Sequence, residues 1–514
     1  MSYDGFLSTA TAIVVASDVD GRVKNEASEL SHKLGHRIAV CDGTADDVEI
    51  QAAIDALPSG GGRVVLTEGS YNVASPITLY GKSDVTVEGQ GSATNIIAPT
   101  SGTFARFLTI GANGSISYRC HLKNIKFTGD TGLTGTSDGI EVGRGGNYAV
   151  DCTLENVYII NVKSSAIAVY SDRTHVINCR SISNGVDLYT SSADDVVIWG
   201  GVYKDTHAYD SGEISYFNGG NRVKVIGTHF EQTTNNGEAI DWRVVDGMLL
   251  GVTVTLGASS GNNGVIINAA TTSGVWVGGR VEHAGYTGTP GAGIQCNAPD
   301  WVFSGITFKW DADTYAVLLQ NSATRTRISD CICLSGAWFV RAYDIAGDIS
   351  IINCHANSSS VTDAIRIDAA TVNFTGLRVI GGSYTGLGGH ALRYVESGGK
   401  TIGDVYVAYT DFSGNTGGTI TGTPTGTNIK YRMIEGYITE NSGTDSIASG
   451  QTTKAVTHGL AATPTRINIT FAEQGTNDYG RWWISSAGAS TFTVNVSADP
   501  GASNLDFWWE ARVN

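Results

Sequence analysis

The sequence predicts an all-β chain whose main part is a right-handed parallel β-helix, with a short N-terminal capping helix and a small C-terminal antiparallel β module. Two observations lead to this prediction. An aliphatic residue, one further residue and then Asn, Gly or Asp recur every 22 to 27 residues, and short stretches of alternating apolar residues follow. A solenoid coil has this length, and each coil buries its apolar side only against its neighbours. The marks of the repeat are Asn156, Asn178, Gly200, Gly227, Gly251, Gly278, Gly305, Asp330, Asn353 and Gly376.

Residues 1–60 contain the predicted cap of the solenoid. Asp46 precedes an amphipathic stretch that includes Val48 and Ile50, and Pro58 with the glycines after it ends the stretch. A solenoid must cover its first coil, because an open sheet edge pairs with other chains. This stretch is therefore expected to be the capping helix.

The solenoid is predicted over residues 61–415, and residues 416–429 are expected to be a linker because they consist mainly of Thr and Gly. Residues 430–514 carry short stretches of alternating hydrophobic residues, which are typical of antiparallel strands. Four tryptophans in this last segment favour a subunit interface, with a sugar-binding platform as the alternative. They are Trp482, Trp483, Trp508 and Trp509.

The composition limits the expected partners. The chain has 49 acidic and 33 basic residues, a net charge of -16, so nucleic acid is not an expected partner. No stretch reaches the roughly 18 apolar residues of a membrane span, and the run from Ala12 to Ala16 lacks the basic flank of a signal peptide. The eight cysteines are expected to be small core residues, because Cys331 and Cys333 lack a second pair at zinc-site spacing.

Two segments resemble known families. CDGTADDVEIQAAIDALPSGGGRVVLTEGSYNV from Cys41, followed by VTVEGQG from Val85, resembles the N-terminal signature of pectate-lyase-like β-helix proteins, which include phage tailspikes and polysaccharide-degrading enzymes. The superfamily contains lyases, hydrolases, epimerases and inactive adhesins, so the resemblance implies a fold more than a reaction. THGLAATPTRINITF from Thr457 resembles C-terminal modules of phage tail fibres. Together these resemblances imply a homotrimer of the virion tail, or an extracellular protein, that binds and cleaves a polysaccharide.

Outward positions on the strand after each mark concentrate charge in the middle of the solenoid. Glu231 and Glu282 are predicted in one column, two coils or about 10 Å apart, with the small Thr255 between them. Inverting glycosidases hold two carboxyls about 6.5–9.5 Å apart and retaining ones about 5–5.5 Å, so the spacing favours inverting hydrolysis by these glutamates. The cations and histidines expected to orient an acidic glycan around them are Lys204, Lys309, Arg280, His229 and His283.

Three alternatives remain open for this patch. In a lyase, Arg280 or Lys204 would neutralise a uronate carboxylate and His229 would take the proton at C5. If the charges only pair across the surface, the chain is a non-catalytic adhesin or fibre. No cofactor is expected. Calcium bound at Asp311 and Asp313 is a weaker alternative. A calcium site needs about six oxygen ligands, and the sequence shows no aspartate cluster on adjacent coils that would supply them.

A second outward face is predicted on the strand that follows the long turn of each coil. Asp187 and Asp241 share a column there and form a rival carboxylate pair for hydrolysis. Simple strand stacking of the aromatic residues, and pairing of the arginines with nearby carboxylates, are the alternatives to polymer binding on this face. The residues expected to bind the polymer are Tyr170, Tyr189, Phe217, Arg243, Arg341, Arg366 and Arg393.

Overall fold

The computed structural model describes residues 10–34, 38–112, 114–130, 132–133, 138–205, 214–233, 237–257, 263–269, 271, 273–283, 291–310, 314–472 and 479–513. The chain divides into two compact units, Met1–Ala323 (unit 1) and Thr324–Asn514 (unit 2). It forms a parallel β-helix of about 14 turns and two small antiparallel sheets, which confirms the predicted all-β fold. Neither of the helices in the described ranges is long and apolar enough to cross a membrane.

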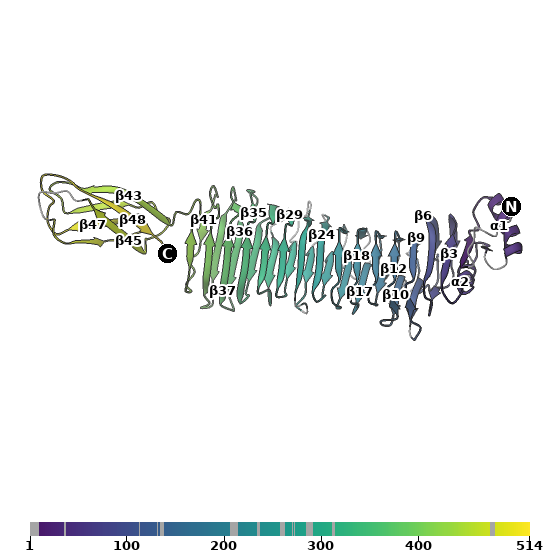
Figure 1. Cartoon of the computed structure of the whole chain (residues 1–514). Helices are drawn as coiled ribbons and strands as arrows, with labels where there is room; N and C mark the ends of the chain where they lie inside the picture. The colour runs from purple at the N-terminus through teal and green to yellow at the C-terminus, as the bar shows by residue number, and fades with distance from the viewer. Residues whose placement is uncertain are drawn as a thin grey trace. The chain divides into compact units, whose positions relative to one another are not determined.

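Unit 1 begins with two helices and two short strands (Figure 1). The predicted capping helix is confirmed, because Ile50 and Ile54 are buried. Val48, which was expected on its apolar side, is instead 60% exposed. The carboxylate of Asp46 accepts hydrogen bonds from the backbone N–H groups of Gly43 and Asn72, at 2.9 and 2.7 Å, and so ties the start of this helix to the first coil. The four elements are β1 (Thr11–Val15), α1 (Gly21–Leu34), β2 (Ile38–Val40) and α2 (Asp47–Asp55).

Two parallel sheets carry the turns of unit 1 (Figure 1). Sheet A supplies two strand segments per turn, separated by a corner, and includes β1 and β2. Its other strands here are β3 (Gly62–Leu66), β4 (Gly69–Asn72), β6 (Val85–Ile97), β9 (His121–Thr128), β12 (Thr153–Glu155), β13 (Tyr158–Ile160), β15 (His175–Ile177), β16 (Arg180–Ile182), β18 (Val197–Trp199), β19 (Val202–Asp205), β21 (Lys224–Ile226), β22 (His229–Gln232), β24 (Gly247–Leu256), β26 (Gly274–His283), β28 (Trp301–Ser304) and β29 (Thr307–Trp310).

Sheet B supplies one strand per turn, after the turn that follows sheet A. A further two-stranded parallel pair, β8 (Ser117–Tyr118) and β11 (Ala149–Val150), connects two early turns. The sheet B strands of unit 1 are β5 (Ile77–Leu79), β7 (Arg106–Ala112), β10 (Asp138–Arg144), β14 (Ser165–Val169), β17 (Val186–Ser191), β20 (Ser215–Asn218), β23 (Ile240–Trp242), β25 (Val265–Ile267), β27 (Ile294–Cys296) and β30 (Tyr315–Gln320).

The repeated Asn, Gly or Asp is the corner inside sheet A. Asn156 and Asn178 have φ values of 52° and 51°, in the left-handed region that Gly and Asn tolerate best. Their side chains also form a ladder, since Asn178 Nδ2 donates to Asn156 Oδ1 at 2.9 Å. The last predicted mark is wrong: Ile352 pairs with Ile380, so the corner above Asn353 is Gly381 and not Gly376.

Each early turn has a second corner with left-handed backbone, and over seven consecutive turns this corner is never a glycine. Its residues are Asp84, Arg119, Asp151, Arg173, Asp195, Arg222 and Asp246. Aspartate and arginine alternate there, so each arginine has an aspartate on the neighbouring turn. This charged ladder was not predicted from the sequence. Its shortest ion pairs are Arg119–Asp84 at 2.6 Å, Arg173–Asp151 at 2.6 Å and Arg222–Asp195 at 2.7 Å.

The interior of the turns is filled with large apolar side chains. Trp242, Trp276 and Trp301 are fully buried in unit 1. Every cysteine of the chain is buried and none of these described residues forms a disulfide, which confirms the expectation of small core residues. The interior is therefore packed, and any chemistry must lie on outward positions.

Unit 2 continues the two parallel sheets. Its strands reach into the segment expected to be a linker, because Leu392 pairs with Ile420. Val407 pairs with Tyr431, so the solenoid also includes the first residues of the segment expected to be the module. The backbone there still follows the coil, and its Thr and Gly residues make a short final rung. The sheet A strands of unit 2 are β31 (Thr326–Ser329), β32 (Ile332–Ser335), β34 (Gly347–Ile352), β35 (His355–Ala356), β37 (Phe374–Ile380), β38 (Ser383–Tyr384), β40 (Ile402–Ala408) and β42 (Lys430–Arg432); those of sheet B are β33 (Trp338–Tyr343), β36 (Asp363–Ala369), β39 (His390–Glu396) and β41 (Gly418–Thr421).

The end of unit 2 is the predicted antiparallel module. Its two three-stranded sheets have the orders β43-β48-β45 and β44-β47-β46. Phe492, Phe507 and Trp509 belong to its core, so Trp509 does not join the surface tryptophans as expected, whereas Trp482 and Trp508 are exposed. The strands are β43 (Glu440–Ile447), β44 (Thr453–Thr457), β45 (Arg466–Phe471), β46 (Trp482–Ser485), β47 (Thr491–Val496) and β48 (Leu505–Arg512).

Candidate functional site

The predicted charged column lies on sheet A of unit 1. The corner fixes the register of the strand after it, so residues at equal distance from the corner stack on successive turns. Glu231 pairs with Thr255 and Thr255 pairs with Glu282, which places the two glutamates two turns apart, as predicted. Lys204 and Lys309 occupy the two outer ends of the same column.

Each glutamate of this column contacts cations. Lys204 Nζ lies 2.5 Å from Glu231 Oε1. Glu282 has two partners, Arg280 Nε at 2.9 Å and Lys309 Nζ at 3.3 Å. Side chains of Glu231 and Glu282 keep 25% and 22% of their surface exposed, so both carboxylates remain accessible to a ligand.

The hydroxyl of Thr255 lies between the two glutamates, and a histidine lies in the neighbouring column. His229 pairs with Thr253, which pairs with Arg280, so these three residues form the neighbouring outward column. His229 Nε2 is 3.1 Å from Thr255 Oγ1. The patch therefore brings together two carboxylates, three cations, an imidazole and the hydroxyl of Thr255 on five adjacent turns.

His283 does not belong to this patch. It follows the outward Glu282 on β26, and because side chains alternate along a strand it points into the solenoid. Its ring is fully buried and lies 5.0 Å from the ring of Trp310. The prediction that His283 lies on the surface and binds substrate is therefore wrong, because its side chain is buried.

An aromatic row lies on sheet B of the same unit, with one correction. Tyr189 pairs with Tyr216, and their ring centroids are 5.6 Å apart, whereas Tyr170 lies 5.7 Å from Tyr189. The third member is Tyr216 and not Phe217. Phe217 is fully buried and packs on Trp242 in the core, because β20 is shifted by one residue from the predicted alternation.

The aromatic row ends at a guanidinium. Tyr216 pairs with Asp241, so Asp241 is the next member of the outward column. Arg243 lies over the ring of Tyr216, at 4.8 Å, and its Nη2 is 2.7 Å from Asp241 Oδ2. The carboxylate holds the guanidinium over the ring, which gives a flat surface that ends in a charged group.

Asp187 does not share the column of Asp241, so the rival carboxylate pair is not formed. Tyr189 occupies that column on β17, two residues after Asp187. Asp187 is only 1% exposed, and its Oδ1 accepts hydrogen bonds from Ser181 Oγ at 2.5 Å and Asn184 Nδ2 at 2.9 Å. It stabilises a buried polar corner of the solenoid.

A buried carboxylate at the other end of the outward column was not predicted as a site residue. Glu141 pairs with Ala168, which pairs with Tyr189, and it is 5% exposed. Arg106 Nη1 lies 2.9 Å from Glu141 Oε2. Burial raises the pKa of Glu141, which Arg106 opposes. Burial also raises the pKa of Tyr170 to about 12, with the Glu141 carboxylate adding to this effect. Alternation alone places Glu141 outward, and no sequence signal shows that it is buried.

The arginine column of unit 2 is confirmed in register and neutralised within the chain. Arg341 pairs with Arg366, which pairs with Arg393. Asp368 contacts the first two, with its Oδ2 2.5 Å from Arg341 Nε and its Oδ1 2.9 Å from Arg366 Nε. Asp363 takes the third, at 3.1 Å from Arg393 Nη1. These contacts favour the structural alternative for Arg341 and Arg366.

One group of possible metal ligands occurs among the described residues, near the start of α2. Asp311 and Asp313, the weaker calcium alternative, lie outside the described residues. Cys41, Asp46 and Glu49 do place ligand atoms within 4.8 Å of one another. Burial raises the pKa of the Cys41 thiol and Asp46 binds backbone amides, so this group serves the start of α2.

No protein-family model and no curated protein matches the chain. Solved structures do match it. The Gp54 tailspike of Acinetobacter baumannii bacteriophage AP22, in complex with an A. baumannii capsular saccharide, is 9% identical with a TM-score of 0.54, over 99% of this chain and 100% of that one. A mutant tailspike protein of E. coli bacteriophage HK620, in complex with a hexasaccharide, is 12% identical with a TM-score of 0.50, over 91% of this chain and 89% of that one. The chain shares its fold with phage tailspikes.

This likeness covers the solenoid from its first turns to its last. The fold implied by the N-terminal signature is thereby confirmed. The residues on the outward columns of this chain give its own surface chemistry, and the function must be argued from them.

Proposed function

We propose that this chain is a tailspike-type protein that binds a polysaccharide on the outward faces of unit 1 and cleaves it. The fold shared with two tailspikes whose structures contain saccharides supports the general class. A location on the virion tail and assembly as a homotrimer are parts of the same proposal. The exposed Trp482, Trp483 and Trp508 of the module would supply apolar area for subunit contacts.

The observation that carries the proposal is the column Glu231–Thr255–Glu282. Two turns of a parallel sheet separate the glutamate Cα atoms by about 10 Å, and their side chains can close part of that distance. A gap of this size leaves room for a water molecule, as inverting glycoside hydrolysis requires. Thr255 is small enough to leave space for a sugar ring above it.

The cations suggest separate roles for the two glutamates. Glu282 contacts two cations, Arg280 and Lys309, and is assigned as the base that activates water. Glu231, which contacts one cation, Lys204, is then assigned as the acid that protonates the leaving oxygen. Water then attacks the anomeric carbon as the glycosidic bond breaks, and the leaving sugar takes the proton of the acid.

The tyrosine row is proposed as a binding surface. Tyr170, Tyr189 and Tyr216 present one ring per turn, and sugar rings pack their C–H faces on aromatic rings. Arg243, fixed over Tyr216 by Asp241, can bind a hydroxyl or carboxylate of the polymer.

A polysaccharide lyase is the second candidate, and the position of His229 favours it. Its Nε2 lies 3.1 Å from Oγ1 of Thr255, the residue on the turn between the two glutamates. In this reaction Arg280 would neutralise a uronate carboxylate, His229 would take the proton at C5, and the C4–O bond would break to leave an unsaturated sugar. This reaction requires a uronic acid, whereas hydrolysis does not.

One experiment separates these functions. The purified protein is incubated with neutral and acidic polysaccharides, including capsular material, and reducing ends are followed together with the ultraviolet absorbance of unsaturated uronates. New reducing ends without absorbance support the hydrolase. Both signals together support the lyase. Saturable binding without either signal contradicts cleavage and leaves an adhesin.

A further inference from the structure

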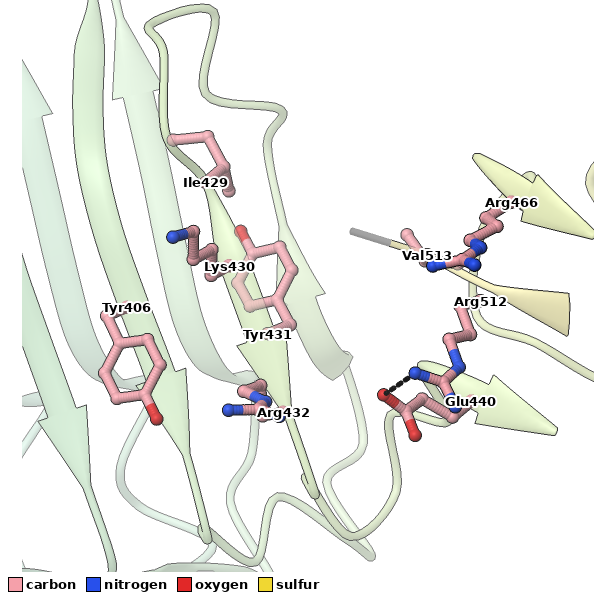
Figure 2. Close-up of a pocket in the computed structure, with 9 residues that line it drawn as sticks. All are labelled: Tyr406, Ile429, Lys430, Tyr431, Arg432, Glu440, Arg466, Arg512 and Val513. Carbon is pink, nitrogen blue, oxygen red and sulfur yellow. Dashed lines mark ion pairs between the residues drawn. The ribbon is translucent and has the colours of Figure 1, made fainter.

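A cavity of about 560 Å³ lies in unit 2, far along the chain from the charged column (Figure 2). One wall comes from strands β40 and β42 and carries Tyr406, Lys430 and Arg432. The opposite wall comes from strands β43, β45 and β48 and carries Arg466 and Arg512. Cavities of roughly 300–1,000 Å³ are the usual size for small-molecule sites.

The lining of this cavity is strongly positive. Lys430, Arg432, Arg466 and Arg512 contribute four positive charges, and Glu440 is the acidic residue among its lining side chains. The balance is therefore +3, four minus one, in a chain whose net charge is -16. This local excess of positive charge, in a chain with a net negative charge, is a feature expected of an anion-binding site.

The chain does little to neutralise this charge. Glu440 Oε1 lies 3.9 Å from Arg512 Nη1, a long contact that Figure 2 marks. Within the described parts of the chain, Lys430, Arg432 and Arg466 have no ion-pair partner. This differs from the arginine column of the same unit, where aspartates bind every guanidinium.

The strand pairing brings two of these cations together. Arg466 lies directly opposite Arg512 in the antiparallel pair β45–β48, and Glu440 lies opposite Arg512 on its other side in the pair β43–β48. Like charges at opposed positions destabilise a sheet. Glu440 supplies one carboxylate on the far side of Arg512, whereas Arg466 has no ion-pair partner in the described residues, so an external anion beside Arg466 would relieve the remaining repulsion.

The lining chemistry indicates what the ligand is. Three of the four cations that line the cavity are arginines: Arg432, Arg466 and Arg512. The planar guanidinium group of arginine can donate two parallel hydrogen bonds to a carboxylate. Tyr406, which pairs with Lys430, adds an aromatic ring and a hydroxyl beside the cations. Nucleic acid fits poorly, because a chain of this negative charge repels a phosphate backbone beyond the cavity.

We propose that this cavity binds a carboxylate-bearing sugar, such as a uronate unit of an acidic polysaccharide. The inference rests on the proposed function, because it takes the polysaccharide as the ligand class. It adds a second, non-catalytic binding site and narrows the polymer to an acidic one. The end of the solenoid would then retain a polymer that the outward columns of unit 1 cleave.

The test is isothermal titration calorimetry on the full chain carrying Glu231→Gln and Glu282→Gln, so that the ligand is not consumed. The probes are an oligogalacturonate and a neutral maltooligosaccharide of equal length. The oligogalacturonate should bind at least tenfold more tightly, and Arg432→Gln with Arg466→Gln should weaken it at least tenfold. The control Lys454→Gln, which removes a module cation paired with Asp445, should change nothing.

Other results would overturn the proposal. Equal affinity of the double variant and its parent, or equal affinity for the neutral sugar, would show that the cavity does not bind the carboxylate. Sulfate that binds as tightly as the oligogalacturonate would reduce the site to one for simple anions. If the double variant fails to fold, Arg432→Gln alone gives the same test. Binding and cleavage are measured separately. A negative titration would therefore contradict the cavity site without contradicting cleavage, and a negative cleavage assay would contradict the proposed enzyme without contradicting binding in the cavity.

Discussion

Tyr189 and Tyr216 occupy the same register position on consecutive turns, and their ring centroids are 5.6 Å apart. The next residue, Phe217, points the opposite way and packs on Trp242 in the core. Two adjacent aromatic residues therefore have separate roles, one on the surface and one in the interior.

This separation predicts opposite effects of two substitutions. Phe217→Ala should destabilise the protein by about 3–5 kcal/mol, because it opens a cavity beside Trp242. Tyr216→Ala should leave the melting temperature almost unchanged and weaken saccharide binding about tenfold. Thermal unfolding and calorimetric binding measure the two effects. A large loss of stability in Tyr216→Ala would contradict the register.

Catalysis by the glutamate pair predicts loss of turnover without loss of binding. Glu231→Gln and Glu282→Gln should each lower kcat about 100-fold or more, because proton transfer in the transition state is removed. The release of reducing ends measures this. Glu155→Gln is the matched control, since Glu155 is also a sheet A carboxylate in a partly exposed contact, 3.3 Å from His121. Full turnover in either glutamine variant at the proposed site would exclude that residue from the chemistry.

The corner inside sheet A predicts which residues a turn accepts. Gly227 has a φ of 60° and open space around the position of a Cβ atom. Gly227→Asn should therefore be tolerated, as asparagine occupies this corner on earlier turns, whereas Gly227→Val should cost about 1–2 kcal/mol of unfolding free energy. Denaturant titration of both variants tests this. Equal stability of the two would show that the backbone conformation is not what selects the residue.

The Asp–Arg ladder predicts a loss of stability in acid. A hydrogen bond from Arg173 lowers the pKa of Asp151. Between this lowered pKa and the ordinary value of about 3.9, Asp151 binds more protons in the unfolded chain than in the folded chain. The ion pair therefore stabilises the fold fully above this pH interval, and the stabilisation is lost as the pH falls through it. Arg173→Gln should lower the melting temperature slightly at pH 7, and the difference from the parent should shrink below about pH 3.

Arg327→Gln is the control for the ladder, because Arg327 has no ion-pair partner in the ranges that the structure describes. Its difference from the parent should not depend on pH in this range. A pH-independent difference for Arg173→Gln as well would mean that its ion pair with Asp151 contributes nothing.

The sequence predicted the turns and one column well, and for a physical reason. The left-handed corner admits few residue types, so it marks the register, and counting from Gly227 and Gly278 places Glu231 and Glu282 correctly. Where no such residue marks the strand, as on sheet B, a shift of one residue exchanged Tyr216 and Phe217. A one-residue shift moves every side chain to the other face.

Other features depend on contacts that a single sequence does not encode locally. Asp187 was expected outward, yet Ser181 and Asn184 bind it in the interior. Helix α1 was not predicted, because its sequence is mostly polar and its apolar contacts are few. The burial of Glu141 depends on elements from other parts of the coil, and alternation carries no information about it.

The fixed corner has a consequence for how such a protein can change. Coils differ in length, from 22 residues between Asn156 and Asn178 to 32 between Asn124 and Asn156, yet the corners remain stacked. Insertions and deletions are therefore absorbed in the turns between strands, and the columns keep their spacing. If the proposed function holds, the loops that contact a polymer can change in length and sequence without moving the glutamates of the charged column.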